Sequence, residues 1–276
     1  MKLEGTVGVV TGASRGINSR IAERLAERGV QLALAARSED ELEIRAKAIR
    51  DNGGKAIAVP TDVTDPRGLE HLIERTHSEL GAIDLLLNGA GIERVVEFQH
   101  VDPQDIISII NTNVLAVEML TRFVVPEMIE RRRGHIVNLA SAAAKTAYPY
   151  NTVNASSKHA VVGFSWSLRE ELREYGVGVS AVCPGFVSDL GLSSRWSVGA
   201  PPAIAGAVSA DKVAKATIKV IEHNRPEVIV SPGLGKLVDV FHAISPGMST
   251  WVARHGGLYR YLEREADHNL PSLPPG

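Results

Sequence analysis

The sequence contains very little cysteine and has no excess of charge of either sign. Cys183 is the single cysteine in 276 residues, which excludes an internal disulfide framework and a zinc finger built from cysteines. The nine histidines are scattered too widely to match the ligand spacing of a zinc site, so we expect no metal centre. Thirty basic residues nearly balance 32 acidic ones, which argues against nucleic acid or an anionic membrane as a partner.

The beginning of the chain also lacks a long apolar segment. Met1 to Gly5 lead into a short apolar run and match neither a signal peptide nor a transmembrane helix. A chain of this length buries enough surface to be stable without disulfides or metal. These features predict a cytoplasmic enzyme, in which Cys183 is a small buried hydrophobic residue at the end of an apolar run.

Short apolar runs alternate with longer amphipathic stretches along the first 230 residues. Continuous apolar strands that alternate with helices form a parallel sheet covered on both faces. We therefore predict an α/β fold, a Rossmann-type doubly wound sheet of seven parallel strands in three layers. No linker interrupts the pattern, so residues 1–230 are expected to form a single domain. The predicted strands are Thr6–Thr11, Val30–Ala36, Lys55–Pro60, Ile83–Asn88, His135–Leu139, Val177–Cys183 and Glu227–Val230.

Several helices have recognisable ends. Ser38 followed by Glu41 predicts a capping box, and long helices are expected over Asp102–Arg133 and Thr152–Tyr175. Residues 231–276 mix glycine, proline and aromatic residues and form a C-terminal extension, with two short helices expected near 236–244 and 248–261. This extension packs against the sheet edge or a neighbouring subunit, covers the substrate, or touches a membrane; the sequence leaves these alternatives open.

A glycine-rich turn connects the first strand to the first helix. It reads Thr11-Gly12-Ala13-Ser14-Arg15-Gly16-Ile17-Asn18. Such a turn presents backbone N–H groups at a helix N-terminus, which suits a pyrophosphate. Glycine also occurs in purely structural turns, but a position after the first strand of a parallel sheet favours cofactor binding.

With this turn, the chain resembles the short-chain dehydrogenase/reductase family over nearly all of residues 5–230. The family motif T-G-x-x-x-G-x-G is matched by Thr11, Gly12 and Gly16, whereas Asn18 replaces the last glycine, where a side chain could crowd the cofactor. Asn88-Gly89-Ala90-Gly91 stands where the family has N-N-A-G. The resemblance places further residues at the cofactor: Ser14, Ile17, Asp62, Val63, Asn88, Ala90, Lys158, Pro184, Gly185 and Val187.

Two arginines indicate which nicotinamide cofactor is preferred. Arg37 follows the second strand, where proteins that prefer NAD usually carry an acidic residue, and Arg15 lies in the glycine turn. Two guanidinium groups at one phosphate favour NADP(H) over NAD(H). The alternative is that both arginines are solvated residues at helix ends.

The resemblance also implies a catalytic group of asparagine, serine, tyrosine and lysine. Asn113, Ser141 and Lys158 match three members, but Asn154 occupies the tyrosine position, four residues before the lysine on the same helix face. An amide does not titrate as a phenol does, so Asn154 can only form hydrogen bonds. Another acid could replace the tyrosine, and Tyr150, Tyr148 and His159 are the candidates; alternatively, catalysis runs through Lys158 or a water molecule.

We therefore expect an NADP(H)-dependent oxidoreductase that transfers a hydride between the cofactor and a ketone or secondary alcohol. The alternative is a cofactor-binding protein with non-redox activity, such as an isomerase, cyclase or lyase, or an inactive member. The loop 186–209 is expected to form a substrate lid, and its apolar character predicts a largely apolar carbonyl or alcohol substrate. The resemblance further implies a homodimer or homotetramer formed through the two long helices.

Overall fold

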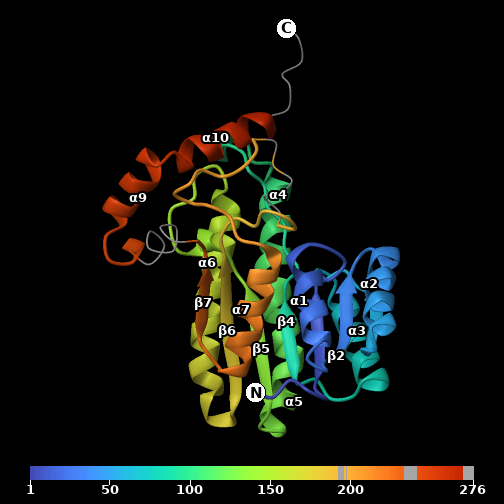
Figure 1. Cartoon of the computed structure of the whole chain (residues 1–276). Helices are drawn as coiled ribbons and strands as arrows, with labels where there is room; N and C mark the ends of the chain where they lie inside the picture. Colours follow the sequence, from blue (N-terminus) through green and yellow to red (C-terminus); the bar gives the residue numbers. More distant parts are fainter. Residues whose placement is uncertain (192–195, 197, 233–240, 270–276) are drawn as a thin grey trace.

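The structure is a computed structural model, and it describes residues 1–191, 196, 198–232 and 241–269. Its centre is a sheet of seven parallel strands in the order β3-β2-β1-β4-β5-β6-β7 (Figure 1). The predicted fold class is thereby confirmed. The strands are β1 (Val7–Thr11), β2 (Gln31–Ala36), β3 (Ala56–Pro60), β4 (Leu85–Asn88), β5 (Gly134–Leu139), β6 (Val177–Pro184) and β7 (Glu227–Val230).

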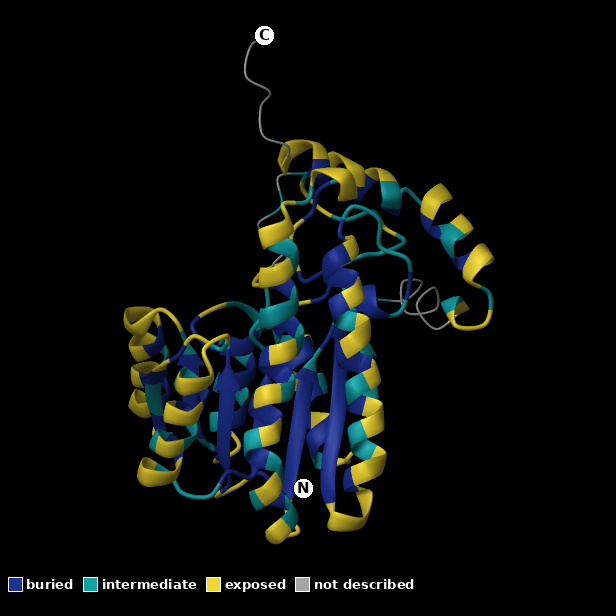
Figure 2. Cartoon of the chain, turned by 180° about the vertical axis from the view of Figure 1, so that it is seen from behind, coloured by how far each residue is buried: buried dark blue, intermediate teal, exposed yellow. Residues whose placement is uncertain are grey.

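Helices cover both faces of this sheet, which explains why its strands are apolar without interruption. One core cluster joins the sheet to α1 (Gly16–Ala26), α2 (Glu39–Asp51) and α7 (Ala210–Glu222). The opposite cluster joins it to α3 (Pro66–Glu79), α5 (Ala116–Glu130) and α6 (Thr152–Leu172). Figure 2 shows the buried strands between helices whose outer sides are exposed.

The predicted helix Asp102–Arg133 runs through α4 (Pro103–Ile110), a π-helical turn (Asn111–Leu115) and α5. Among the described helices, Pro103–Glu130 alone has the length and mean hydropathy, 1.3, of a possible membrane span. Leu120, Val124 and Met128 of this helix are buried in the core beside the sheet. A third of its most apolar window is buried in this way, and a single helix of this kind is weak evidence for a membrane span.

Two predicted helix details are wrong. The Ser38 hydroxyl makes no capping hydrogen bond to the described residues of α2; Glu39, Asp40 and Glu41 fill the first turn, where carboxylates interact favourably with the helix dipole. The helix expected at 248–261 is divided into α9 (Pro246–His255) and α10 (Leu258–Asn269), because Gly257 has a φ angle of +84°. The helix expected at 236–244 lies largely outside the described residues.

The C-terminal helix α10 lies above the carboxyl end of the sheet, whereas the N-terminus lies at the opposite end (Figure 1). Leu258, Tyr261 and Leu262 of α10 form an aromatic and aliphatic cluster with Phe186 and Ala253. The extension thus packs onto the loop that follows β6. This packing places α10 over the end of the sheet where ligands bind in parallel α/β folds.

Candidate active site

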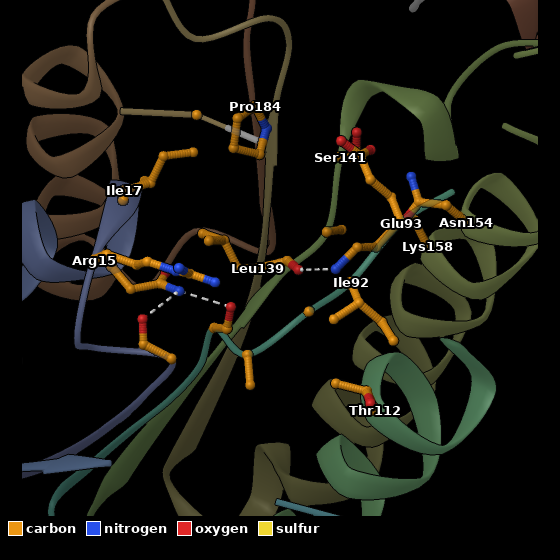
Figure 3. Close-up of a pocket in the computed structure, with 18 of the residues that line it drawn as sticks. Arg15, Ile17, Ile92, Glu93, Thr112, Leu139, Ser141, Asn154, Lys158 and Pro184 are labelled. Atoms are coloured by element: carbon orange, nitrogen blue, oxygen red, sulfur yellow. Dashed lines mark hydrogen bonds between the residues drawn. The ribbon is translucent and has the colours of Figure 1, made fainter. Parts of the chain in front are cut away.

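A cavity of about 740 Å³ opens at the carboxyl ends of the strands. Its lining comes from the glycine turn, the ends of β2 to β6 and the beginning of α6. Figure 3 shows Arg15 and Ile17 on one side of this pocket, and Ser141, Glu93, Asn154 and Lys158 gathered on the other. The predicted site residues in the lining are Gly12, Ser14, Arg15, Gly16, Ile17, Arg37, Asp62, Val63, Ala90, Ser141, Asn154, Lys158, Pro184, Gly185 and Val187.

The turn between β1 and α1 has the conformation that an anion site needs. Gly12 and Gly16 have φ angles of +68° and +74°, which glycine adopts without steric cost. A Cβ atom at Gly12 would lie 2.9 Å from the Cα atom of Ala90. Arg15 is the N-cap residue of α1, and its side chain makes no capping hydrogen bond to the described residues. The backbone N–H groups of the first turn are therefore free to bind an anion.

Asn18 connects this turn to the loop after β4. Its Nδ2 atom donates hydrogen bonds to the carbonyl oxygens of Gly12, at 3.3 Å, and Gly89, at 2.7 Å. A Cβ atom at Gly89 would lie 2.5–2.7 Å from the amide atoms of Asn18. The family pattern has glycine at position 18 and asparagine at position 89. In this chain the two residue types are exchanged between these positions, which lie in contact.

The end of the cavity that contains the glycine turn is charged. Arg37, which follows β2, lines it together with Arg15 and Asp62. Hydrogen bonds from the backbone N–H and hydroxyl of Thr64 lower the pKa of Asp62, and the charge of Arg37 lowers it further. Asp62 is therefore ionised, and its negative charge interacts with the positive charge of Arg37. Arg37 also lines the cavity.

Lys158 and Ser141 lie at the reaction end of the cavity. The Lys158 Nζ atom donates a hydrogen bond to the Leu139 carbonyl at 3.0 Å. Burial lowers the pKa of Lys158 to about 8, while the negative charge of Glu93 opposes this shift. The Ser141 hydroxyl accepts a hydrogen bond from the N–H of Ala143 at 3.1 Å, which leaves its proton available for donation to a ligand.

Asn113 and Asn88 are placed behind the lining and hold it in position. Asn113 sits in the π-helical turn, fully buried, and forms two hydrogen bonds of 2.9 Å with the backbone N–H and carbonyl of Ile92. It also donates to Asn154 Oδ1 at 3.3 Å. Asn88 donates to Asn138 Oδ1 at 2.8 Å and to Thr121 Oγ1 at 3.1 Å. Neither asparagine is among the described residues that line the cavity; both position neighbouring residues through hydrogen bonds.

Of the three predicted substitutes for the missing tyrosine, only Tyr148 is among the described residues that line the cavity. The Tyr150 hydroxyl donates to Glu263 of α10 at 3.2 Å. Burial, followed by the charge of Glu263, raises the pKa of Tyr150 further above neutrality. His159 is exposed, and its ring contacts the Ala155 carbonyl one turn back along α6.

The sequence interpretation missed Glu93, which lies in the cavity beside Lys158 and Asn154. Its Oε2 atom accepts a hydrogen bond from Asn151 at 3.0 Å, and its Oε1 atom accepts one from the Trp196 indole at 3.3 Å. One signal was available: Glu93 is a titratable residue two positions after the Asn88–Gly91 run at a strand end. Its partners lie too far away in the sequence to be inferred from spacing.

Aromatic side chains form the wall of the cavity next to the C-terminal extension. Phe186 packs edge-on against Trp196 and Tyr261, with ring centroids 5.7 and 5.5 Å apart, and Trp196 stacks on Tyr261 at 5.7 Å. The Tyr261 hydroxyl donates to the Gly199 carbonyl at 2.9 Å. The extension thus supports part of the predicted lid loop.

Comparisons with known proteins agree with this geometry. The short chain dehydrogenase family model matches residues 6–195. Ketoacyl reductase HetN of Nostoc sp. strain PCC 7120 is 37% identical over 97% of this chain and 95% of its own length. The 3-oxoacyl-[acyl-carrier-protein] reductase FabG of Vibrio cholerae is 36% identical over 68% of this chain and 75% of its own length.

Two solved structures also have a fold similar to that of this chain. An actinorhodin polyketide ketoreductase with NADPH superimposes with a TM-score of 0.78 at 30% identity, covering 83% of this chain and 97% of that one. A metagenomic short-chain oxidoreductase in complex with NADP gives a TM-score of 0.71 at 29% identity, covering 85% and 100%. The chain therefore belongs to the short-chain dehydrogenase/reductase family, whose oxidoreductases bind a nicotinamide cofactor.

Proposed function

We propose that this chain is an NADP(H)-dependent oxidoreductase that interconverts a ketone and a secondary alcohol. The observation that carries the proposal is that one cavity of about 740 Å³ joins the glycine turn and two arginines to Lys158 and Ser141. A dinucleotide needs an anion site and a reaction site in one continuous space. The names of the relatives, ketoacyl and polyketide ketoreductases, support a carbonyl substrate.

The residues at the first end fit a phosphorylated dinucleotide. The N-terminus of α1 is uncapped by Arg15, which suits a phosphate group. The buried Oδ1 atom of Asn18 has no hydrogen-bond partner among the described residues, so it can accept a hydrogen bond from a hydroxyl or amino group of the nucleotide. Arg15 and Arg37 supply positive charge where a 2′-phosphate would lie. These features support NADP(H) over NAD(H).

At the reaction end, each residue has a role that follows from its contacts. Ser141 keeps a hydroxyl proton to donate to the substrate oxygen, and this donation polarises the carbonyl group. Lys158, fixed by Leu139, binds the nicotinamide ribose. When bound, the cofactor supplies or accepts the hydride. Phe186, Trp196 and Gly199 of the loop 186–209 contact Tyr261, and this loop covers an apolar substrate.

Asn154 favours a second candidate, a cofactor-binding protein without redox turnover. Its amide accepts a hydrogen bond from Asn113 and has no proton to exchange near neutrality. Under this alternative, NADPH binds but no carbonyl compound is reduced. Restoration of turnover by Asn154→Tyr would identify a redox site that has been lost.

The test combines a binding titration with a substrate panel. NADPH and NADH are titrated by fluorescence into the wild-type chain, Arg37→Ala and the exposed control Arg67→Ala. We expect Arg37→Ala to weaken NADPH about 10- to 100-fold, as for loss of a charged hydrogen bond, with NADH nearly unchanged. NADPH oxidation is then followed with ketones and a β-ketoacyl thioester. Equal affinity for both cofactors in wild type would contradict the NADP preference.

We also propose that the chain forms a homodimer or homotetramer through α4, α5 and α6. Ile107, Met119 and Trp166 lie on these helices and Leu115 lies in the π-helical turn between α4 and α5; all four side chains are 40–50% exposed in the single chain. Such a set of large apolar side chains is typical of an interface between subunits. Light scattering after size-exclusion chromatography tests this, and Leu115→Glu is expected to shift the mass toward the monomer.

A further inference from the structure

At the reaction end of the cavity, beside Lys158 and Asn154, lies Glu93, a carboxyl residue to which the family resemblance assigns no role. Glu93 lies in the loop that follows β4. Asn113 fixes its neighbour Ile92 through hydrogen bonds to the backbone N–H and carbonyl of Ile92, each 2.9 Å long. Two further donors, Asn151 and Trp196, hold its oxygens at 3.0 and 3.3 Å. The carboxyl group is therefore held in a defined position at the cavity, next to Ser141 and Asn154 (Figure 3).

The partners of Glu93 leave room for a proton. From the described residues, each carboxyl oxygen accepts one hydrogen bond, so each has a further lone pair that can carry a proton or contact a ligand. Asn151 and Trp196 can continue to donate when the proton leaves, because both are permanent N–H donors. The site therefore accommodates Glu93 as a carboxylic acid and as a carboxylate.

Four groups set the charge state of Glu93, and they come from different elements. Burial raises the pKa of Glu93, and the negative charge of Glu265 on α10 adds to this increase. Hydrogen bonds from Asn151 and Trp196, and the ammonium group of Lys158 on α6, act in the opposite direction. The net effect is an increase, so Glu93 keeps its proton to a higher pH than an exposed glutamate.

We propose that Glu93 donates the proton to the substrate oxygen during reduction and accepts it during oxidation, in place of the phenol that is absent at position 154. This inference rests on the proposed redox function. In reduction, a C–H bond forms at the carbonyl carbon from the hydride while the carbonyl oxygen takes the proton from Glu93. The substrate is reduced to an alcohol and the nicotinamide is oxidised. The carboxylate that remains is stabilised by Asn151, Trp196 and Lys158, and solvent returns its proton.

The other acids are placed less well for this step. Tyr150 donates to Glu263, and His159 is exposed on α6. Tyr148 also lines the cavity, so it is the competing proton donor that an experiment must separate from Glu93.

The test uses Glu93→Gln, which keeps the size and polarity of the side chain but has no carboxyl proton. We expect kcat for ketone reduction to fall about 10²- to 10⁴-fold while the Kd for NADPH stays within about threefold. Glu93→Asp should recover part of the rate. Glu97→Gln, which changes a carboxylate outside the described cavity lining, should remain near wild type. Tyr148→Phe should lower kcat much less than Glu93→Gln does.

A second readout uses the protein without cofactor. Infrared difference spectra recorded across a pH titration should show the carbonyl stretch of a protonated carboxyl group that persists to higher pH than that of an exposed glutamate and is lost in Glu93→Gln. Glu265→Gln removes a negative neighbour, so both this titration and the alkaline limb of kcat for reduction should move to lower pH.

The outcomes separate this inference from the proposed function. Wild-type turnover that persists within threefold in Glu93→Gln overturns the role of Glu93 alone, as does loss of turnover in Tyr148→Phe only. An infrared band that remains in Glu93→Gln also overturns it. A wild-type chain that binds NADPH but reduces no carbonyl compound overturns the proposed redox function and, with it, this assignment.

Discussion

Asn18 and Gly89 share one volume between the glycine turn and the end of β4, so substitutions at these two positions should not act independently. Asn18→Gly removes the two hydrogen bonds to the carbonyls of Gly12 and Gly89. At about 1 kcal/mol each, their loss lowers the free energy of unfolding by about 2 kcal/mol. Glycine near the start of α1 costs a few tenths more.

Gly89→Asn alone should cost a similar amount. Its Cβ atom would lie 2.5–2.7 Å from the Asn18 amide, which must rotate away and give up both hydrogen bonds. Overpacking of this kind typically costs about 1–3 kcal/mol. If the two effects were additive, the double variant would lose about 4 kcal/mol. We expect a loss of only about 1 kcal/mol, because the double variant again places a single amide in this volume.

Urea denaturation of the wild type, both single variants and the double variant measures the coupling energy, expected at about 2–3 kcal/mol. Gly163→Asn is the control, since an added Cβ there meets no atom within 4 Å among the described residues. Combined with Asn18→Gly, it should be additive within about 0.5 kcal/mol. A coupling energy of the same small size between Asn18 and Gly89 would show that they do not share this volume.

Three further predictions follow from burial. Burial lowers the pKa of Lys158 to about 8, so the buried ammonium group destabilises the folded chain at pH 7, and Lys158→Met should raise the free energy of unfolding by about 1–2 kcal/mol. This gain should shrink from pH 8 to 10.5, because over this range the folded wild type carries a neutral Lys158. A gain that does not change with pH in urea melts would contradict this. Burial lowers the pKa of His135 to about 3, so below pH 6.5 the unfolded chain binds a proton that the folded chain does not. The wild type should therefore lose about 2 kcal/mol from pH 6.5 to 5 that His135→Gln does not lose, as compared by urea midpoints at both pH values. Tyr261→Ala removes the ring that packs on Phe186 and Trp196 and should speed proteolysis within 186–209; an unchanged cleavage rate would contradict this support.

The sheet could be predicted because burial on both faces leaves a direct trace in the sequence. Val9 and Val10 are adjacent in β1, yet they belong to opposite core clusters, and both are fully buried. An uninterrupted apolar run is therefore required there, and it indicates a central parallel strand. The helices of the C-terminal extension were harder to delimit, because Gly256 and Gly257 interrupt a stretch whose apolar spacing continues across them.

Some local details depend on contacts that residue type alone does not specify. Ser38 has the right neighbours for a capping box, but its side chain lines the cofactor cavity. Asn111–Leu115 forms a π-helical turn inside a helix whose apolar spacing shows no interruption. That turn places Asn113 against Ile92, 21 residues earlier, and no pattern within the helix indicates this contact.

The positions of Ser141, after β5, and Lys158, on α6, could be predicted because both residues lie in family-like motifs. Glu93 could not be predicted in this way, because its hydrogen-bond partners Asn151 and Trp196 lie 58 and 103 residues away in the sequence. The order of strands in the sheet brings these segments together, since β4 and β5 are neighbours and α6 follows β5.

Asn18 and Asn154 both depart from the family motifs, but they are not equally strong evidence against redox activity. On the sequence alone, Asn18 and Asn154 together favour the non-redox alternative more than either would alone, because both fall in the region of cofactor and catalysis. The structure separates them: Asn18 fills the space that Gly89 leaves and forms hydrogen bonds across it. Asn18 is thus half of an exchange, and it adds nothing to the case for an inactive site. That case depends on Asn154 alone, and Glu93 stands beside it with a carboxyl group that can carry the proton the amide lacks.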